Sequence, residues 1–340
     1  MARTVARHEP RRRLTWPDGA PRVGIHLNVA HGLMRAARRA RQIGATALQI
    51  FSDNPTAWRR RPEPPVDAAQ FIAFCEQHGI APVAIHASYL INLAGTAEPF
   101  AQQSLEGLRH EVRRAPDYGA SLVNTHIGSH RGVGEKAGLT RIGTVVSAVL
   151  ADAPPGVRLV LENSAGGGDT LGSRIEELAA ILDAVGGSSA QLAFCLDTAH
   201  LWGAGYDIST PDGVVAVLDR FDALIGLDRL ALIHLNDSKS GLGSRSDRHE
   251  HLGAGRIGSA GLAAFLRDPR LPGRTTLVME TPGVDEGYDA VNLRRSWLLH
   301  GGAETLPVLP PSALRLTRRS TRAAPSAGRS GSERAVRRRG

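Results

Sequence analysis

Two histidines and an aspartate alternate within one short stretch, Asp247-Arg248-His249-Glu250-His251. In an extended backbone every second side chain points to the same side, so Asp247, His249 and His251 would share one face. A carboxylate beside imidazoles at this spacing suits a divalent metal ion, with Zn²⁺ as the first candidate. A solvated polar loop explains the stretch equally well, because short motifs also match by chance. Ligands elsewhere in the chain must decide between these two interpretations.

Metal-capable side chains also end a series of short apolar runs, each typical of a buried β-strand. The runs are residues 22–28, 47–51, 82–86, 122–126, 157–162, 191–197, 230–235 and 275–280. From the third run on, each has a His, Glu or Asp at or near its C-terminal end, namely His86, His126, Glu162, Asp197, His234 and Glu280. Neighbouring members of this series lie 35 to 46 residues apart, about one strand–helix unit. Three further candidates follow shortly after two of the runs, namely His200, Asp247 and His249.

Segments with helical periodicity separate the apolar runs. We expect helices at 33–43, 67–77, 100–118, 139–151, 174–185, 212–225, 257–266 and 288–299. Pro116 should end or kink the third of these helices. Eight apolar strands alternating with helices predict an α/β fold, a single-domain TIM-type (β/α)8 barrel, with a doubly wound open sheet as the alternative. In a barrel the C-terminal strand ends meet on one face, so all these candidates would converge there.

A buried cluster of carboxylates requires compensating cations, because like charges repel and burial removes their hydration. One histidine among these candidates could be an ordinary hydrogen-bonded residue, but six strand ends in register do not share that explanation. Five histidines and four carboxylates make nine ligands. At roughly three or four ligands per ion, nine ligands suit two or three metal ions, with one carboxylate bridging.

The positive charge of the chain is concentrated at its two ends. The net charge is +8, of which residues 1–20 carry +3 and residues 311–340 carry +8, leaving −3 for residues 21–310. Both ends are rich in Arg, Ser, Pro, Gly and Ala, so we expect a disordered basic arm at 1–20 and a disordered basic tail at 301–340. The barrel domain would then occupy residues 21–300. Arg-rich tails suit a phosphate backbone, although the chain's general preference for Arg over Lys explains them equally well.

The composition predicts a cytoplasmic protein that does not enter membranes. No apolar run reaches 18 residues, and no apolar segment follows the basic N-terminal residues as a secretory signal would require. Cys75 and Cys195 lie far apart in apolar segments, which is typical of buried, reduced residues. The sequence is nearly silent on oligomeric state, and we expect a monomer.

Seven motifs, in order, resemble the endonuclease IV family of apurinic/apyrimidinic (AP) endonucleases over about residues 22–299. They are His86-Ala-Ser-Tyr-Leu-Ile-Asn-Leu-Ala94, Asn124-Thr-His-Ile-Gly-Ser-His130, Leu161-Glu-Asn-Ser-Ala-Gly166, Cys195-Leu-Asp-Thr-Ala-His-Leu-Trp-Gly-Ala-Gly-Tyr-Asp207, His234-Leu-Asn-Asp-Ser-Lys239, Asp247-Arg-His-Glu-His-Leu-Gly253 and Glu280-Thr-Pro282. The resemblance implies a barrel with three Zn²⁺ ions, some of them replaceable by Mn²⁺. It implies three ligand sets: His86, His126 and Glu162; a bridging Glu162 with Asp197, His234 and Glu280; and His200, Asp247 and His249. His251 is left over, either to orient a neighbour or to contact DNA.

The resemblance also implies an activity. Members of this family hydrolyse the phosphodiester 5′ to an abasic site in double-stranded DNA during base excision repair, which leaves a 3′-hydroxyl. They also remove blocking groups from 3′ ends, as phosphodiesterases or phosphatases. Glu162 and Glu280 would hold metals around an attacking hydroxide, which is nucleophilic near neutral pH. Three Zn²⁺ ions would add +6 to the −3 of residues 21–310, which suits a phosphate substrate.

Two loops are expected to contact DNA. The resemblance places Tyr89 and Leu90 in the gap left by the missing base, with packing inside their own loop as the alternative. Asn54 and Thr56 lie in the other loop, where the family commonly has an Arg at the position of Thr56. This departure predicts weaker lesion affinity unless a neighbouring arginine, Arg59 or Arg60, replaces the missing one.

Two other functions fit parts of the sequence. A metal-dependent sugar isomerase or epimerase on a related barrel would use one or two ions and would not need the set of His200, Asp247 and His249. A non-catalytic nucleic-acid-binding protein would depend on the Arg-rich ends instead. Metal content and the effect of deleting residues 311–340 discriminate among the three functions.

Overall fold

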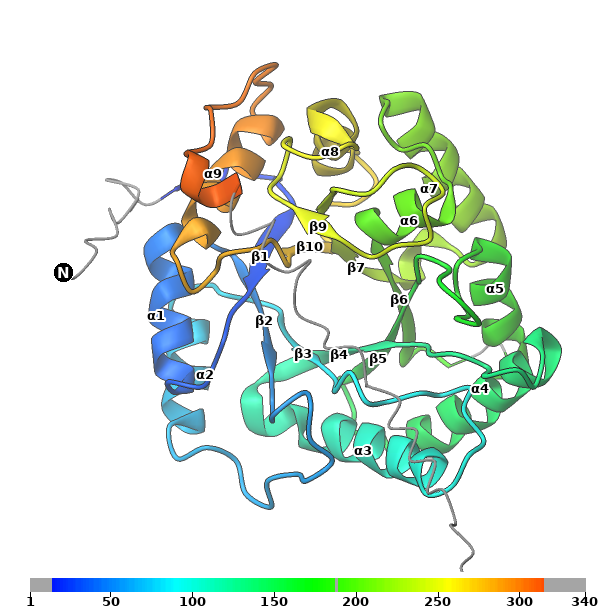
Figure 1. Ribbon diagram of the computed structural model, residues 1–340. Helices are drawn as coiled ribbons and strands as arrows, with labels where there is room; N and C mark the ends of the chain where they lie inside the picture. The colour runs from blue at the N-terminus through cyan, green and yellow to red at the C-terminus, as the bar shows by residue number, and fades with distance from the viewer. Residues whose placement is uncertain (1–13, 187–188, 315–340) are drawn as a thin grey trace, which may run out of the picture. The chain divides into compact units, whose positions relative to one another are not determined.

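The computed structural model describes residues 14–186 and 189–314 (Figure 1). Within these ranges, eight parallel strands close into a barrel in the order β1-β10-β7-β6-β5-β4-β3-β2. Their bounds are β1 Arg22–His26, β2 Ala47–Phe51, β3 Val83–His86, β4 Ala120–His126, β5 Arg158–Glu162, β6 Leu192–Asp197, β7 Leu230–His234 and β10 Thr276–Met279. The closed ring confirms the predicted TIM-type barrel and excludes the open sheet.

Helices follow the strands and form a layer around the barrel (Figure 1). They are α1 Leu33–Ile43, α2 Ala68–Gln77, α3 Phe100–Arg114, α4 Glu135–Leu150, α5 Ile175–Ala184, α6 Thr198–Ala204, α7 Pro211–Leu224, α8 Gly258–Arg267 and α9 Tyr288–His300, with 3₁₀ turns η1 Ala115–Tyr118 and η2 Leu227–Arg229. Pro116 does end α3 early, and the chain continues as η1. None of the described helices is long and apolar enough to cross a lipid bilayer.

Small and aliphatic side chains fill the interior of the barrel. The cluster consists of Ala84, Leu122, Val160, Ala193, Cys195, Ala231, Leu232 and Val278. Several members stand two residues before a predicted ligand, as Val160 stands before Glu162 and Leu232 before His234. Because strand side chains alternate with a period of two, these ligands point the same way as the interior residues. The barrel therefore places the ligands above its packed interior, at the mouth formed by the C-terminal strand ends.

Three short elements are not predicted from the sequence. Helix α6 begins directly after β6, where the Asp197 carboxylate accepts a hydrogen bond from the backbone N–H of His200 at 2.9 Å. Strands β8 Asp237–Ser238 and β9 His249–Glu250 form a two-stranded antiparallel sheet in the long loop after β7. Helix α6 and strand β9 hold two of the predicted ligands, His200 and His249, and Asp247 lies in the loop just before β9, so these elements bear directly on the site.

The barrel unit extends further in sequence than we predicted. The Trp16 indole donates to the carbonyl of Gly44 at 3.1 Å, and the guanidinium of Arg295 donates to the carbonyl of Pro307 at 2.6 Å. Residues 14–20 and 301–307 therefore pack on the barrel rather than forming a disordered arm and tail, because they contribute apolar side chains such as Trp16. Residues 308–314 belong to a separate unit. The disorder predicted for 1–13 and 315–340 concerns residues outside those described.

Candidate metal centre

The nine predicted ligands lie together at the C-terminal mouth of the barrel. Six of them end strands β3 to β7 or directly follow β10, and the other three come from α6, β9 and the loop before β9. Among the described residues, four groups of three offer ligand atoms within 4.8 Å of one another. These groups are His86, His126 and Glu162; Glu162, Cys195 and His234; Asp197, His200 and His249; and Asp197, His234 and Glu280.

Glu162 lies at the centre of the cluster with only 1% of its surface exposed. Its Oε1 is 3.6 Å from Nε2 of His126, 3.2 Å from Nδ1 of His200 and 3.4 Å from Nδ1 of His234. Its Oε2 lies 3.7 Å from Nε2 of His86. One carboxylate thus faces four imidazoles, which is the position that a bridging ligand requires.

The remaining carboxylates connect the rest of the cluster. Oδ2 of Asp197 lies 3.9 Å from Nδ1 of His234 and 3.4 Å from Nε2 of His249. Oε2 of Glu280 lies 3.3 Å from the same nitrogen of His234. Asp247 places its two oxygens 3.1 Å from Nε2 of His249 and 3.2 Å from Nε2 of His200. The structure thus brings all nine residues together, while their role as ligands stays a prediction.

In three imidazoles of this cluster, one ring nitrogen is held by a backbone carbonyl. Nδ1 of His86 lies 2.7 Å from the carbonyl of the next residue, Nδ1 of His200 lies 2.9 Å from that of Asn163, and Nδ1 of His249 lies 3.1 Å from that of Glu280. A carbonyl only accepts hydrogen bonds, so each Nδ1 carries a proton, and in the neutral imidazole that a metal ion binds, the Nε2 lone pair is directed at the cluster. Metal-binding histidines in proteins are usually held in this way.

Three buried atoms at the centre form no hydrogen bond within the described part of the chain: Oε1 of Glu162, Nδ1 of His234 and Nε2 of His249. Leaving buried polar atoms unsatisfied is costly, so such a group indicates a missing binding partner. The lone pairs and carboxylate oxygens that meet here are all electron-pair donors. The partner that fits them is a cation, and the mixed nitrogen and oxygen set suits a divalent metal such as zinc.

The electrostatics of the cluster lead to the same conclusion. Burial opposes the charging of His249, but the carboxylates of Asp197 and Asp247 outweigh it and raise its pKa well above the usual value. Burial likewise opposes ionisation of Glu162, but the surrounding histidines, His234 first among them, lower its pKa well below the usual value. The cluster therefore attracts positive charge strongly, whether protons or metal ions supply it.

Comparisons with known proteins agree with this geometry. A family described as a xylose isomerase-like TIM barrel matches residues 37–298. A probable endonuclease 4 of Chloroflexus aggregans is 38% identical over 275 residues, which cover 80% of this chain and 96% of that protein. One of Methanoculleus marisnigri is 39% identical over 274 residues, with 80% and 96% covered. The chain belongs to the endonuclease IV family.

Solved structures separate the endonuclease IV family from others on the same barrel. The crystal structure of endonuclease IV from Thermus thermophilus matches with a TM-score of 0.70 and 39% identity, covering 82% of this chain and 100% of that one. A D-tagatose 3-epimerase-like protein matches with a TM-score of 0.62 but only 15% identity, covering 82% and 97%. The second likeness shows a shared fold alone.

The two loops predicted to contact DNA lie side by side at the rim of the cluster. The carbonyl of Pro55, in the loop after β2, accepts a hydrogen bond from the backbone N–H of Tyr89, in the loop after β3, at 3.1 Å. Tyr89 is 55% exposed, and its ring lies 6.0 Å from that of His126 at an angle of 25°. Leu90 next to it is partly buried. Tyr89 is therefore positioned to contact a ligand that approaches the cluster.

Asn54 and Thr56 are exposed at the tip of the loop after β2. Oδ1 of Asn54 accepts hydrogen bonds from the backbone N–H and the hydroxyl of Thr56, at 3.0 and 2.9 Å, which closes a turn. Arg60 does not replace the arginine common in the endonuclease IV family at position 56. Its side chain is only 10% exposed, and its Nε lies 3.7 Å from the buried carboxylate of Glu111. Arg59 remains exposed.

His251 does not join the cluster, although it alternates with Asp247 and His249 in sequence. Its ring is fully buried, 5.5 Å from the ring of Tyr288, and its Nδ1 lies 2.9 Å from the amide nitrogen of Asn292. The shared face that the alternation suggests thus does not extend to His251, the residue left over from the three predicted ligand sets, because β9 ends at Glu250 and His251 packs against α9.

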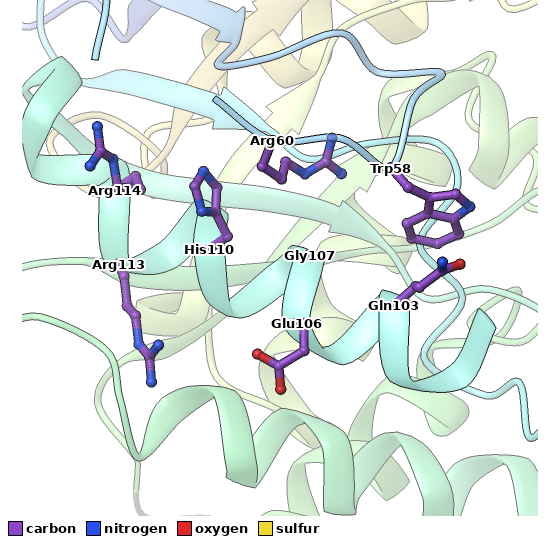
Figure 2. Close-up of a pocket in the computed structure, with 8 residues that line it drawn as sticks. All are labelled: Trp58, Arg60, Gln103, Glu106, Gly107, His110, Arg113 and Arg114. Carbon is purple, nitrogen blue, oxygen red and sulfur yellow. The ribbon is translucent and has the colours of Figure 1, made fainter. Parts of the chain in front are cut away.

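A separate hollow of about 440 Å³ lies along α3 (Figure 2). Trp58 and Arg60 come from the loop after β2, and the other lining residues, all on α3, are Gln103, Glu106, Gly107, His110, Arg113 and Arg114. We call this hollow the α3 pocket. None of its lining residues belongs to the cluster of predicted ligands, and none of them is in a group with metal-site spacing.

Several buried polar residues of the centre are not predicted from the sequence. Asn124 donates to Oε2 of Glu162 at 2.6 Å, and Asn236 donates to Oδ2 of Asp197 at 2.7 Å. Asn124 stands two residues before His126, so strand alternation could have revealed it. Gln49 lies in the middle of β2 and is fully buried; it is a polar residue inside an apolar run, but nothing in the sequence indicates its partners.

Proposed function

We propose that this chain is a metal-dependent AP endonuclease of base excision repair. It would hydrolyse the phosphodiester 5′ to an abasic site in double-stranded DNA and leave a 3′-hydroxyl. The observation that supports this most is the convergence of nine residues with nitrogen and oxygen donors, Glu162 at their centre, with three central atoms that form no hydrogen bond among the described residues. The relatives that share this barrel at 38–39% identity are named endonuclease 4 or endonuclease IV.

We assign three Zn²⁺ positions to the cluster, some of which Mn²⁺ could share. The first would be held by His86, His126 and Glu162; the second by Glu162, Asp197, His234 and Glu280; the third by His200, Asp247 and His249. Bound zinc would supply Lewis-acid charge to activate water and to stabilise charge on phosphate oxygens. Glu162 and Glu280 are the central carboxylates, and the facing histidines, against the effect of burial, lower the pKa of both. They therefore remain ionised and act by holding positive charge.

Residues at the rim would hold the DNA. An abasic nucleotide has no base to unstack, so turning it out of the duplex costs less than turning out an intact one. Tyr89, with Leu90 beside it, lies next to His126 and could fill the gap that remains. Arg248 is exposed between Asp247 and His249 in sequence, where a guanidinium can contact a phosphate.

The same centre would remove blocking groups from 3′ ends, because these also present a phosphate at a gap without a paired base. A monomer suffices for either reaction, since one chain supplies all nine donors. Sugar epimerases share the barrel, but the group containing His200 and His249 favours the nuclease, because isomerase chemistry with one or two ions does not need it.

The test is cleavage of a duplex that contains one tetrahydrofuran abasic analogue, with an undamaged duplex of the same sequence as the control. Zinc-loaded protein should cut the damaged strand once, 5′ to the lesion. A chelator should suppress the reaction, and added Zn²⁺ should restore it. Uncut lesion duplex at stoichiometric zinc-loaded protein would reject the proposal, and turnover of a ketose under the same conditions would support the epimerase.

A further inference from the structure

Gln49 lies in β2, below the ligand residues, with no exposed surface. Its amide nitrogen donates a hydrogen bond to Oε1 of Glu280 at 2.7 Å and lies 3.0 Å from Nδ1 of His26. Its amide oxygen lies 3.1 Å from Nε2 of His234. One uncharged side chain thus contacts two of the predicted ligands, and both belong to the second metal position.

The chemistry of these partners fixes the orientation of the Gln49 amide. A carboxylate only accepts hydrogen bonds, so the NH₂ group must face Glu280 and the carbonyl oxygen must face His234. Nε2 of His234 therefore carries the proton and donates it to Gln49. In the neutral imidazole that a metal ion binds, the other nitrogen, Nδ1, is a lone pair; it lies 3.3 Å from Oε2 of Glu280 and 3.4 Å from Oε1 of Glu162.

His234 differs in this respect from three other histidines of the cluster. His86, His200 and His249 are each held by a backbone carbonyl, which no side-chain substitution removes. Among the described contacts, the outer nitrogen of His234 is held by a side chain instead. The orientation of His234 therefore depends on the identity of residue 49.

We propose that Gln49 is a positioning residue for the second metal position. Its carbonyl selects the His234 tautomer that directs Nδ1 at the ion, and its NH₂ group holds Glu280 so that the opposite carboxylate oxygen faces the same point. The inference rests on the metal assignment proposed above. Residues that hold metal ligands in this way typically contribute about 10- to 100-fold to metal affinity.

The experiment measures zinc affinity directly, on the full chain, by competition with a chromophoric chelator. Gln49→Leu removes both contacts, and Gln49→Glu keeps an acceptor for His234 while replacing the donor to Glu280 with a negative charge. The near-isosteric Gln49→Glu keeps the test valid if Gln49→Leu does not fold. We expect wild-type protein to bind three ions and each variant to bind one of them about 10- to 100-fold more weakly.

Gln191→Leu is the matched control. Gln191 also uses its amide nitrogen for several contacts, with the carbonyls of Ala153, Pro154 and Val157, but it lies beside the N-terminal end of β6 rather than at the mouth of the barrel. Its variant should keep all three zinc affinities. Asp247→Asn removes a ligand of the third position. Combined with Gln49→Leu, it should weaken the binding of two ions instead of one, which would show that Gln49 acts on a position other than the third.

The outcomes separate this inference from the proposed function. If wild-type protein binds no zinc, the metal assignment itself fails. If it binds three ions and both Gln49 variants bind them equally tightly, the inference is wrong while the proposed function stands. A uniform loss of all three affinities, together with lower stability of the metal-free protein, would show a merely structural role and would also overturn the inference.

Discussion

The cluster at the barrel mouth and the α3 pocket both gather histidine and charged side chains, yet their charges are arranged in opposite ways. Two arginines that line the α3 pocket are each paired with an acid outside its lining: Arg113 lies 3.0 Å from Asp152, and Arg114 lies 2.8 Å from Asp117. In the cluster, carboxylate oxygens and imidazole lone pairs face one another, and three atoms have no hydrogen-bond partner among the described residues. Unmet charge, more than the size of a hollow, therefore indicates where a ligand binds.

This difference predicts how each region responds to substitution. Exposed ion pairs contribute little, typically about 0–1 kcal/mol, because water and salt screen them. Buried ligands that share an ion cannot be replaced singly without leaving the others uncompensated. Substitutions in the cluster should therefore strongly lower metal binding and nicking, while those in the α3 pocket should change the free energy of unfolding only slightly.

The largest effect is expected for Glu162→Gln. The amide cannot supply the negative charge that two metal positions share, so nicking of the lesion duplex should fall on the order of 10⁴-fold, about 5.4 kcal/mol of transition-state stabilisation. Initial rates and metal content measure the effect. Glu176→Gln, at an exposed ion pair with Arg220, is the control and should retain full activity. Full activity of Glu162→Gln would show that the charge of Glu162 is not needed for nicking.

Asp247→Asn should have the next largest effect. Asp247 contacts both His200 and His249, but its side chain is 51% exposed and its substitution leaves the other two positions intact. We expect one ion fewer per chain and nicking lowered on the order of 10²-fold, or about 2.7 kcal/mol. Metal analysis and rates on the same preparation test this. A variant that keeps full nicking after losing one ion would show that the third metal position is not needed for the reaction.

Strand alternation and spacing were sufficient to predict the barrel and the convergence of ligands. Six of the nine predicted ligands end strands or directly follow one, so the rule that parallel strand ends share a face placed them without knowledge of the loops. The bounds of β2, at Ala47–Phe51, and of α1, at Leu33–Ile43, also agree with the predicted ranges. These elements have clear apolar periodicity and glycine or polar residues at their ends.

Contacts between distant segments could not be predicted in the same way. His251 continues the alternation of Asp247 and His249, yet it packs against Tyr288 on α9, and the local pattern contains no sign of that helix. Gln49 is a polar residue inside an apolar run, and its role depends on Glu280, 231 residues away in sequence. Trp16 packs on the barrel although its neighbours have the composition of a disordered arm.

Glu111 is a buried carboxyl on α3, next to Arg60 of the α3 pocket, and it predicts a pH dependence of stability. Burial raises its pKa to about 7 from an ordinary value of 4.5, although the Ser52 hydroxyl and Arg60 oppose the shift. Between these values the folded state holds a proton that the unfolded state releases. The contribution of Glu111 to the free energy of unfolding should therefore fall as the pH rises toward 7, by at most about 1.4 kcal/mol per pH unit. Above pH 7 this contribution should level off.

Glu111→Gln should remove this slope, because the amide does not titrate. Urea unfolding of both proteins between pH 5 and 8, at constant metal content, gives the difference that belongs to Glu111 alone. The gap between the two unfolding free energies should widen in favour of the variant as the pH rises. Parallel curves would mean that Arg60 compensates the carboxylate fully, as the surface pairs of the α3 pocket do.

Tyr89→Ala tests the rim of the cluster. Stacking of an aromatic side chain in DNA contributes roughly 1–3 kcal/mol, so we expect KM for the lesion duplex to rise about 10-fold with a smaller change in kcat. Phe100→Ala is a matched control, since Phe100 is 58% exposed, close to the 55% of Tyr89, but neighbours Trp58 of the α3 pocket at 6.5 Å. Equal effects of the two variants would argue against a specific role of Tyr89.

The smallest effect is expected for Arg113→Ala in the α3 pocket. Arg113 is 55% exposed, and its partner Asp152 keeps a second contact, 3.3 Å from Nε of Arg109. Loss of one exposed pair should lower the unfolding free energy by less than about 1 kcal/mol, because the remaining charges stay hydrated and partly paired. Nicking should stay within about twofold of wild type, since the pocket's charges are already neutralised within the protein. A fall in nicking of about tenfold or more, together with a shallower salt dependence of DNA binding, would instead show that Arg113 contacts a phosphate. The α3 pocket would then be part of the DNA-binding surface.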